Sequence, residues 1–228
     1  INIDVKTTAR DLGTQLNFGI SANGATINKR MMDAITTAER LTYLPMDLLK
    51  KKRIIKGLTL SKALYGIEAA PASKNAINRL SCSIVRAMGF RGKFVSKELA
   101  FQISQEAGEL DPQINILVRR AVLLRRVIAR FPEINPIVTD ILQHYTNAGV
   151  PGSAAGYIRQ EEDQAQMKLC LGPVGLLVSS LAQNRAFLNY NLDIVSPQIV
   201  SITNVLTTPW QDYRSNLTLM AQRDRFHK

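Results

Sequence analysis

The sequence has few of the residues from which catalytic and metal-binding sites are usually built. Its 228 residues include two cysteines, two histidines and one tryptophan, and no two aspartates are adjacent. Cys82 and Cys170 lie far apart in apolar, helix-like patterns, which favours reduced core residues over a disulfide or a metal site. His144 and His227 are too distant in sequence to indicate a ligand pair. We therefore expect no catalytic residue, no metal ligand and no bound cofactor in this chain.

Long hydrophobic runs and nucleotide-binding loops are missing as well. The longest apolar run, residues 174–181, is interrupted by glycine and serine and is too short to span a bilayer. The sequence contains no Gly-x-x-x-x-Gly-Lys string, no Gly-x-Gly-x-x-Gly string and no start like that of a signal peptide. We expect an intracellular protein in a reduced compartment, nuclear or cytoplasmic, with no membrane partner.

Positive charge, by contrast, is concentrated in one stretch. Residues 29–97 hold 15 lysines and arginines against four acidic residues, and this excess of +11 equals the formal charge of the whole chain. Residues 1–28 have two basic and two acidic residues, and residues 98–228 have twelve of each, so both segments are neutral. A basic segment in an otherwise neutral chain is typical of a surface that meets a polyanion such as nucleic acid.

Alternating apolar residues at the N-terminus predict two short strands that form a β-hairpin. We place the turn near residues 7–9 and expect the second strand to pack on the helix that follows. The apolar positions of the two strands are Ile1, Ile3, Val5, Leu12, Leu16 and Phe18. Because the chain opens with Ile1 inside this pattern and has no initiating Met, we expect it to be a piece of a longer protein.

From residue 24 onward the apolar spacing changes to three and four, which is typical of amphipathic helices. It predicts helices over residues 27–41, from Pro45 to Tyr65, and over residues 74–88. We expect Tyr65 to be buried, and Gly66 either to allow close approach of a neighbouring segment or to end the helix before Pro71. The second helix carries Lys50–Arg53 in its first half, where cations oppose the helix dipole. Nearby phosphate would explain this charge, and a solvated lysine-rich face fits the same pattern.

The later half is predicted to be helical, with clear punctuation. Asp111-Pro112 and Asn135-Pro136 each pair a capping residue with proline at the first helical position. The helix after Asp111 carries arginines along one side, and residues 149–156 form a glycine-rich linker. These arginines are Arg119, Arg120, Arg125, Arg126 and Arg130. Beyond the linker we expect a helical segment and a polar tail that contains Trp210.

The order of these features resembles one family of polymerases. A strand with Asp11-Leu-Gly13 is followed by an amphipathic helix, Leu44-Pro45, a lysine-rich helix, the string Ala63-Leu-Tyr-Gly-Ile-Glu68 and a helix ending near Met88-Gly89. Mainly over residues 5–90, this resembles the region downstream of the catalytic palm in reverse transcriptases of non-LTR (LINE-type) retrotransposons. The paired arginines after residue 118 also resemble the connector of one branch of that family.

The resemblance implies a mainly α fold, in which a short N-terminal β-hairpin is followed by a helical thumb-like bundle and further helices. Leu12 and Gly13 would belong to the primer-grip strand pair, and Leu64, Tyr65, Gly66 and Glu68 to a structural motif of the thumb. The expected parts are a strand pair at 1–20, a basic thumb-like domain at 24–92, a connector at 96–148, the linker at 149–156 and a C-terminal segment at 157–228.

By the same resemblance, the catalytic aspartates and their Mg²⁺ ions lie in a palm before Ile1. The implied partners are this palm and a template–primer duplex of RNA or of RNA and DNA. We expect the isolated chain to lack RNA-directed DNA polymerase activity and to clamp the duplex through phosphate contacts. The expected contacts are Lys29, Arg30, Lys50, Lys51, Lys52, Arg53, Lys56, Lys74 and Arg79.

The basic segment also fits a second function. In this alternative the chain is a freestanding basic helical module that binds RNA, DNA or an acidic protein and has no catalytic role. A palm with its aspartate pair upstream of Ile1 would decide for the polymerase.

Overall fold

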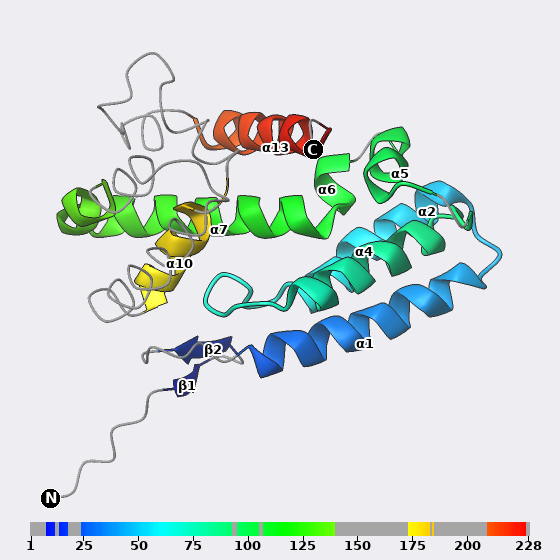
Figure 1. Cartoon of the computed structure of the whole chain (residues 1–228), viewed down its shortest axis with the longest axis horizontal. Helices are drawn as coiled ribbons and strands as arrows, with labels where there is room; N and C mark the ends of the chain where they lie inside the picture. The colour runs from blue at the N-terminus through cyan, green and yellow to red at the C-terminus, as the bar shows by residue number, and fades with distance from the viewer. Residues whose placement is uncertain are drawn as a thin grey trace, which may run out of the picture.

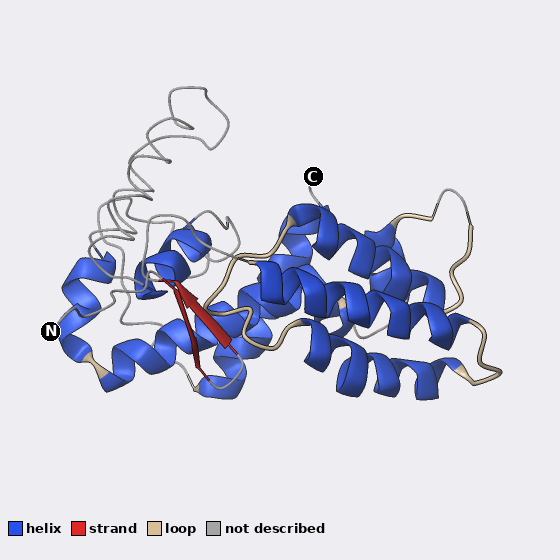
Figure 2. Ribbon diagram, turned by 90° about the horizontal axis from the view of Figure 1, so that it is seen from below, coloured by secondary structure: helices blue, strands red, loops and turns tan. Residues whose placement is uncertain are grey.

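A computed structural model of the chain describes residues 8–11, 14–17, 24–92, 95–104, 107–139, 173–182, 184 and 209–226. These residues are mainly helical, as the sequence predicted (Figures 1 and 2). The elements are β1 (Thr8–Asp11), β2 (Thr14–Asn17), α1 (Ala25–Thr42), α2 (Leu48–Ile54), the π-helix Ile55–Leu60, α3 (Ser61–Ala63), α4 (Lys74–Ala87), α5 (Lys97–Ile103), α6 (Ala107–Leu110), α7 (Pro112–Arg130), the 3₁₀-helix Pro132–Ile134, α10 (Pro173–Ala182) and α13 (Trp210–Phe226).

The predicted N-terminal β-hairpin needs correction. β1 pairs with β2 in an antiparallel ladder of four residue pairs from Thr8–Asn17 to Asp11–Thr14, so the turn is not at residues 7–9. Where burial is described, the hydrophobic core contains helical and turn residues only, so the all-α part of the predicted fold is the part that fits.

Much of the predicted primer grip lies outside the described residues. This holds for Leu12, Gly13 and Phe18, and the side chain of Leu16 is likewise not described. The expected packing of this strand on the first helix therefore stays a prediction.

α1 and α4 run side by side in the same direction, and the helix from Leu48 to Ala63 returns between their ends (Figure 1). At the start of the pair, the Ser73 amide donates to Asn28 Oδ1 at 3.0 Å. At its end, Arg91 donates to the Thr42 carbonyl at 2.8 Å. Both predicted helices are thus confirmed. Small buried side chains allow close packing of these helices, among them Ala34, Ala38, Ala76 and Ala87.

The returning helix begins at Leu48, capped by Asp47, rather than near Pro45. Its middle is π-helical over residues 55–60, and a π turn holds more residues than an α turn. Residues four apart therefore line up, and the buried line is Lys51, Ile55, Thr59 and Ala63. From the sequence we expected the apolar side of this helix to run through Leu48, Leu49, Ile54, Ile55, Leu58 and Tyr65. That expectation was wrong in part, because Leu48, Leu49, Leu58 and Tyr65 are all exposed.

Two hydrophobic clusters form the core, and α7 contributes to both. The first holds α1, the Leu48–Ala63 helix, α4 and α5, with Ile116 of α7. The second holds most of α7 with α10 and α13, including Leu124, Leu181 and Tyr213. α7 begins as predicted, since Asp111 is its N-cap and accepts from the Gln113 amide at 2.9 Å. It is therefore the central helix of the described structure (Figure 1).

The last part of the chain was predicted as a polar tail, yet residues 210–226 form the helix α13. It packs on α7 through Tyr213, Leu217 and Ala221. At its end, Arg225 forms ion pairs with Asp111 and with Glu98 of α5, the latter at 2.7 Å. α13 is thus held to α7 by an apolar stripe and by a partly buried arginine.

Candidate nucleic-acid interface

The lysine-rich row of α2 is mostly engaged within the chain. The Lys50 backbone amide donates to the carboxylate of Asp47, the N-cap of α2, and the Lys50 ammonium lies 3.3 Å from the same carboxylate. Lys52 donates to the Ser104 carbonyl, and Lys56 pairs with Glu109. Lys51 is only 9% exposed. Of the five cations predicted here as phosphate contacts, Arg53 alone is exposed and has no hydrogen bond or ion pair to the described residues.

Asp47 illustrates how strongly this row is neutralised locally. Its carboxylate accepts from the Lys50 backbone amide at 2.7 Å. This hydrogen bond, together with the charges of Lys50 and Arg53, lowers the pKa of Asp47 below its ordinary value of 3.8. The carboxylate is therefore ionised at neutral pH beside the cations it offsets.

The other predicted contacts lie on α1 and α4. Arg30 points toward the chain: it donates to the Tyr65 carbonyl at 2.9 Å, and its guanidinium lies over the Tyr65 ring at 4.9 Å. Lys29, Lys74 and Arg79 are exposed and make no hydrogen bond or ion pair to the described part of the chain. The sequence argument missed Arg40 and Arg86, which share these properties. We call Lys29, Arg40, Lys74, Arg79 and Arg86 the cationic face.

The cationic face has few opposing charges. On α1 and α4 the acidic residues are Asp33, which lies 3.8 Å from Lys62, and Glu39. Arg79 and Arg86 are seven residues apart, so they lie on one stripe of α4, about 10.5 Å apart along its axis. That distance corresponds to roughly three nucleotides of one strand at 3.4 Å each. Arg79 and Arg86 can therefore contact two phosphates of one strand that are about three nucleotides apart.

The Leu64–Ala70 turn, which contains most of the string Ala63-Leu-Tyr-Gly-Ile-Glu68, accepts hydrogen bonds from three arginines. Arg119 donates to the Leu64 carbonyl at 3.3 Å and lies 3.8 Å from Glu68. Arg120 donates to the carbonyls of Ile67 and Ala70, each at 3.2 Å. Burial lowers the pKa of Arg120 to about 10, against the opposing effect of Glu68, so it stays charged at neutral pH. Together with Arg30, which donates to the Tyr65 carbonyl, these side chains donate to four carbonyls of the turn that follows the helix.

The string Leu64–Glu68 is structural, but not as expected. Tyr65 is 48% exposed, so its predicted burial was wrong, while Leu64 and Ile67 are fully buried. Tyr65 extends outward beneath Arg30 instead. Gly66 has φ of +79°, a conformation that favours glycine at a helix end. The helix itself ends at Ala63 with Leu64 as its C-cap, so Gly66 belongs to the turn that follows the helix.

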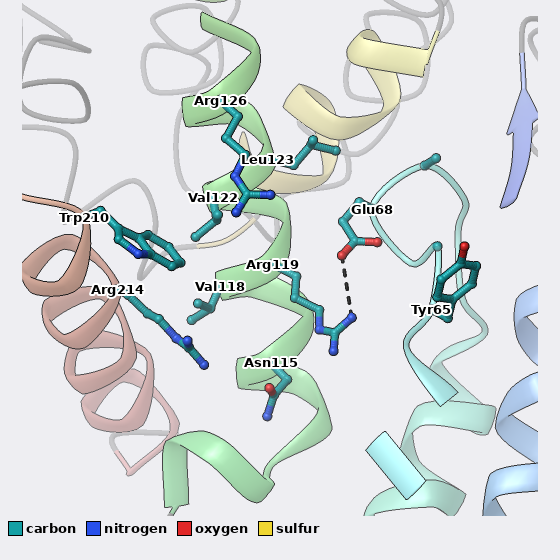
Figure 3. Close-up of a pocket in the computed structure, with 12 residues that line it drawn as sticks. Tyr65, Glu68, Asn115, Val118, Arg119, Val122, Leu123, Arg126, Trp210 and Arg214 are labelled. Carbon is teal, nitrogen blue, oxygen red and sulfur yellow. Dashed lines mark ion pairs between the residues drawn. The ribbon is translucent and has the colours of Figure 1, made fainter. Parts of the chain in front are cut away.

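A groove opens between this turn, α7 and α13, with a volume of about 610 Å³ (Figure 3). Val118 and Val122 of α7 line its floor, Trp210 and Arg214 of α13 form one wall, and the 65–69 segment forms the other. Its cations are Arg119, Arg126 and Arg214, against one carboxylate, Glu68. We call it the Trp210 groove. The sequence argument did not find it, because it joins segments about 50 and 90 residues apart.

Comparisons with known proteins give no family for this chain. No family model matches it, and there is no significant match among curated proteins or solved structures. Within the described residues, no group of three or more His, Cys, Asp or Glu side chains is placed to hold a metal ion. No described helix is both long and apolar enough to cross a membrane.

Proposed function

We propose that this chain binds a nucleic-acid duplex through phosphate contacts made by the cationic face, in the role of the thumb and connector of a reverse transcriptase. The observation that carries the proposal is the set of five exposed cations on two adjacent helices, whose only acidic residues are Glu39 and Asp33, the latter 3.8 Å from Lys62. Backbone contacts of this kind give affinity without sequence preference, as a polymerase moving along its template requires.

The position of Lys74 adds to this argument. It is the first residue of α4, whose first turn has no acidic residue and whose N-cap, Ser73, makes no side-chain cap hydrogen bond. A lysine at that end opposes the helix dipole, typically by 0.3–1 kcal/mol. A phosphate bound there would interact favourably with both the lysine and the helix end.

The proposal is tested by salt titration of duplex binding. We expect Arg79→Gln with Arg86→Gln to reduce the slope of log K against log salt by about 1.8, because each neutralised phosphate contributes about 0.9. Different duplex sequences should weaken alike, since phosphate contacts carry no direct base information. Fluorescence anisotropy of a labelled RNA–DNA hybrid at several salt concentrations measures both quantities.

The matched control is Arg130→Gln with Arg223→Gln, which removes the same charge from exposed positions on α7 and α13. Its slope should equal that of the unmodified chain. Equal slopes for all three proteins would remove the cationic face from the interface. Tight binding of an acidic protein together with salt-insensitive, weak duplex binding would favour the protein-interaction alternative.

A further inference from the structure

We propose that the Trp210 groove binds a single strand of nucleic acid, with a base stacked on Trp210 and phosphates on Arg126 and Arg214. This inference rests on the proposed function in that both need a nucleic-acid ligand. It concerns different elements, since the groove lies between the Leu64–Ala70 turn, α7 and α13, while the cationic face lies on α1 and α4.

The exposure of Trp210 is not explained by packing. α13 is anchored to α7 by Tyr213 and Leu217, both fully buried, and by Ala221. Trp210 is the first residue of that helix, is 44% exposed and lines the groove. Arg214, one turn further on, places its guanidinium 5.9 Å from the indole ring centre. An exposed indole beside a guanidinium is the arrangement on which bases of single strands stack.

The charges of the groove favour an anionic ligand. Arg119 lies 3.8 Å from Glu68 and donates to the Leu64 carbonyl, so part of its hydrogen-bonding capacity is taken up within the chain. Arg126 is exposed and makes no hydrogen bond or ion pair to the described residues. In Figure 3, Arg126 extends from α7 and Arg214 from α13, and both line the groove. Two guanidinium groups are thus available for phosphate oxygens beside the indole.

The shape of the groove fits a chain better than a compact ligand. A second hollow of about 610 Å³ lies along α13, and Trp210 and Arg214 line this hollow as well. It is lined further by the uncharged polar side chains of Gln211, Ser215, Thr218 and Gln222, and by Glu109, which pairs with Lys56. The apolar floor of the first hollow, Val118 and Val122, suits the flat face of a base. An acidic peptide would use the arginines but would leave the indole without a stacking partner.

The single tryptophan of the sequence makes a direct test possible. A 12-nucleotide oligo(dT) strand should quench the fluorescence of Trp210 as it binds, because a stacked base contacts the indole. The same strand labelled with fluorescein gives the affinity by anisotropy. Trp210→Ala should weaken binding about tenfold, and Trp210→Phe should restore most of it because phenylalanine also stacks.

The arginines are tested in the same assay. Arg126→Gln with Arg214→Gln should reduce the salt slope for the single strand by about 1.4, at about 0.7 for each phosphate. The matched control replaces Arg214→Gln by Arg223→Gln, an exposed arginine nine residues along α13 and therefore on its opposite side. That double variant should lose only about half as much slope, through Arg126.

Three results would overturn the inference. The first is saturating binding of oligo(dT) without quenching of Trp210, and the second is an unchanged affinity in Trp210→Ala. The third is an oligo-glutamate peptide that quenches Trp210 and competes with oligo(dT) at equal affinity, which would make the groove a protein-docking site. Duplex binding and its dependence on Arg79 and Arg86 are measured separately. A negative result for single-strand binding in the groove can therefore be told apart from a negative result for the proposed function.

Discussion

The arginines around the Leu64–Ala70 turn and the arginines of the cationic face are chemically identical but differ in their surroundings. Arg30, Arg119 and Arg120 donate to backbone carbonyls of the turn that follows a helix. Arg79 and Arg86 face solvent on α4. A backbone carbonyl and a phosphate oxygen are both good acceptors for a guanidinium. The arginines of this chain therefore divide into those that donate to its own carbonyls and those that face solvent, and sequence alone does not show the division.

The largest expected effect tests the internal group. Arg120→Met keeps the apolar stem but removes every donor from the carbonyls of Ile67 and Ala70. We expect the free energy of unfolding to fall by about 2 to 3 kcal/mol, since hydrogen bonds to charged groups contribute roughly 1.5–3 kcal/mol and leave unpaired acceptors when lost. Urea denaturation followed by circular dichroism measures this change.

Two further variants define the cause of that loss. Arg120→Lys keeps the charge but lacks the planar fork, so about half of the loss should remain. Arg130→Met, an exposed position on the same helix, should change stability by less than about 0.5 kcal/mol. A loss of equal size in Arg130→Met would mean that the helix, and not the bonds to the turn, is affected.

A smaller effect on stability depends on pH. It concerns Asp111, the ion-pair partner of Arg225. Burial raises the pKa of Asp111 above its ordinary value of 3.8, more than the Arg225 charge and the Gln113 amide lower it. The folded chain then keeps a proton that the unfolded chain releases. The contribution of Asp111 to stability is thus present below pH 3.8 and is lost as pH rises through its folded pKa.

Asp111→Asn removes this titration. The stability of the unmodified chain minus that of the variant should therefore fall as pH rises upward from about 4, by at most about 1.4 kcal/mol per pH unit. Glu98, which remains in both proteins, has a lowered pKa: burial opposes the shift, but its own backbone amide, Ser96 and Arg225 outweigh it. Urea midpoints between pH 4 and 7 give the difference, and a difference that rises with pH would contradict the raised pKa.

The sequence predicted the helices well because local signals agreed there. Apolar spacing located α1 and α4, and the Asp111-Pro112 pair located the start of α7. It failed where winding or distant partners decide. The π-helical turn put Thr59 inside and Leu58 outside, and a period of 3.6 does not foresee that change. α13 was missed because its anchors, Tyr213 and Leu217, gain their meaning only beside α7.

The candidate interface shows the same limit. Charge counting identified the right segment for exposed cations, since Lys29, Lys74 and Arg79 are all exposed. It could not show that Lys52 and Lys56 bind Ser104 and Glu109, because those partners lie about fifty residues away. The density of lysines in α2 was therefore a poor guide to which of them are available for phosphate.

The smallest expected effect follows from that correction. Replacing Lys50, Lys51, Lys52 and Arg53 of α2 by Gln removes four charges, twice as many as the change of Arg79 and Arg86. We nevertheless expect the salt slope of duplex binding to fall by less than about 1, because Arg53 alone of the four is exposed and without a described partner.

A stability measurement on the same variant should separate the structural role of Lys51 and Lys52 from phosphate binding by Arg53. Lys52 donates to the Ser104 carbonyl, and the stem of Lys51 lies in the buried line of its helix, so the quadruple change should lower the free energy of unfolding. Arg53→Gln alone should leave stability unchanged and reproduce the whole of the small slope change. A slope reduction of 2 to 3 in the folded quadruple variant would instead mean that Lys50 and Lys52 leave Asp47 and Ser104 to bind phosphate, and that the division between internal and ligand-facing charge changes when nucleic acid binds.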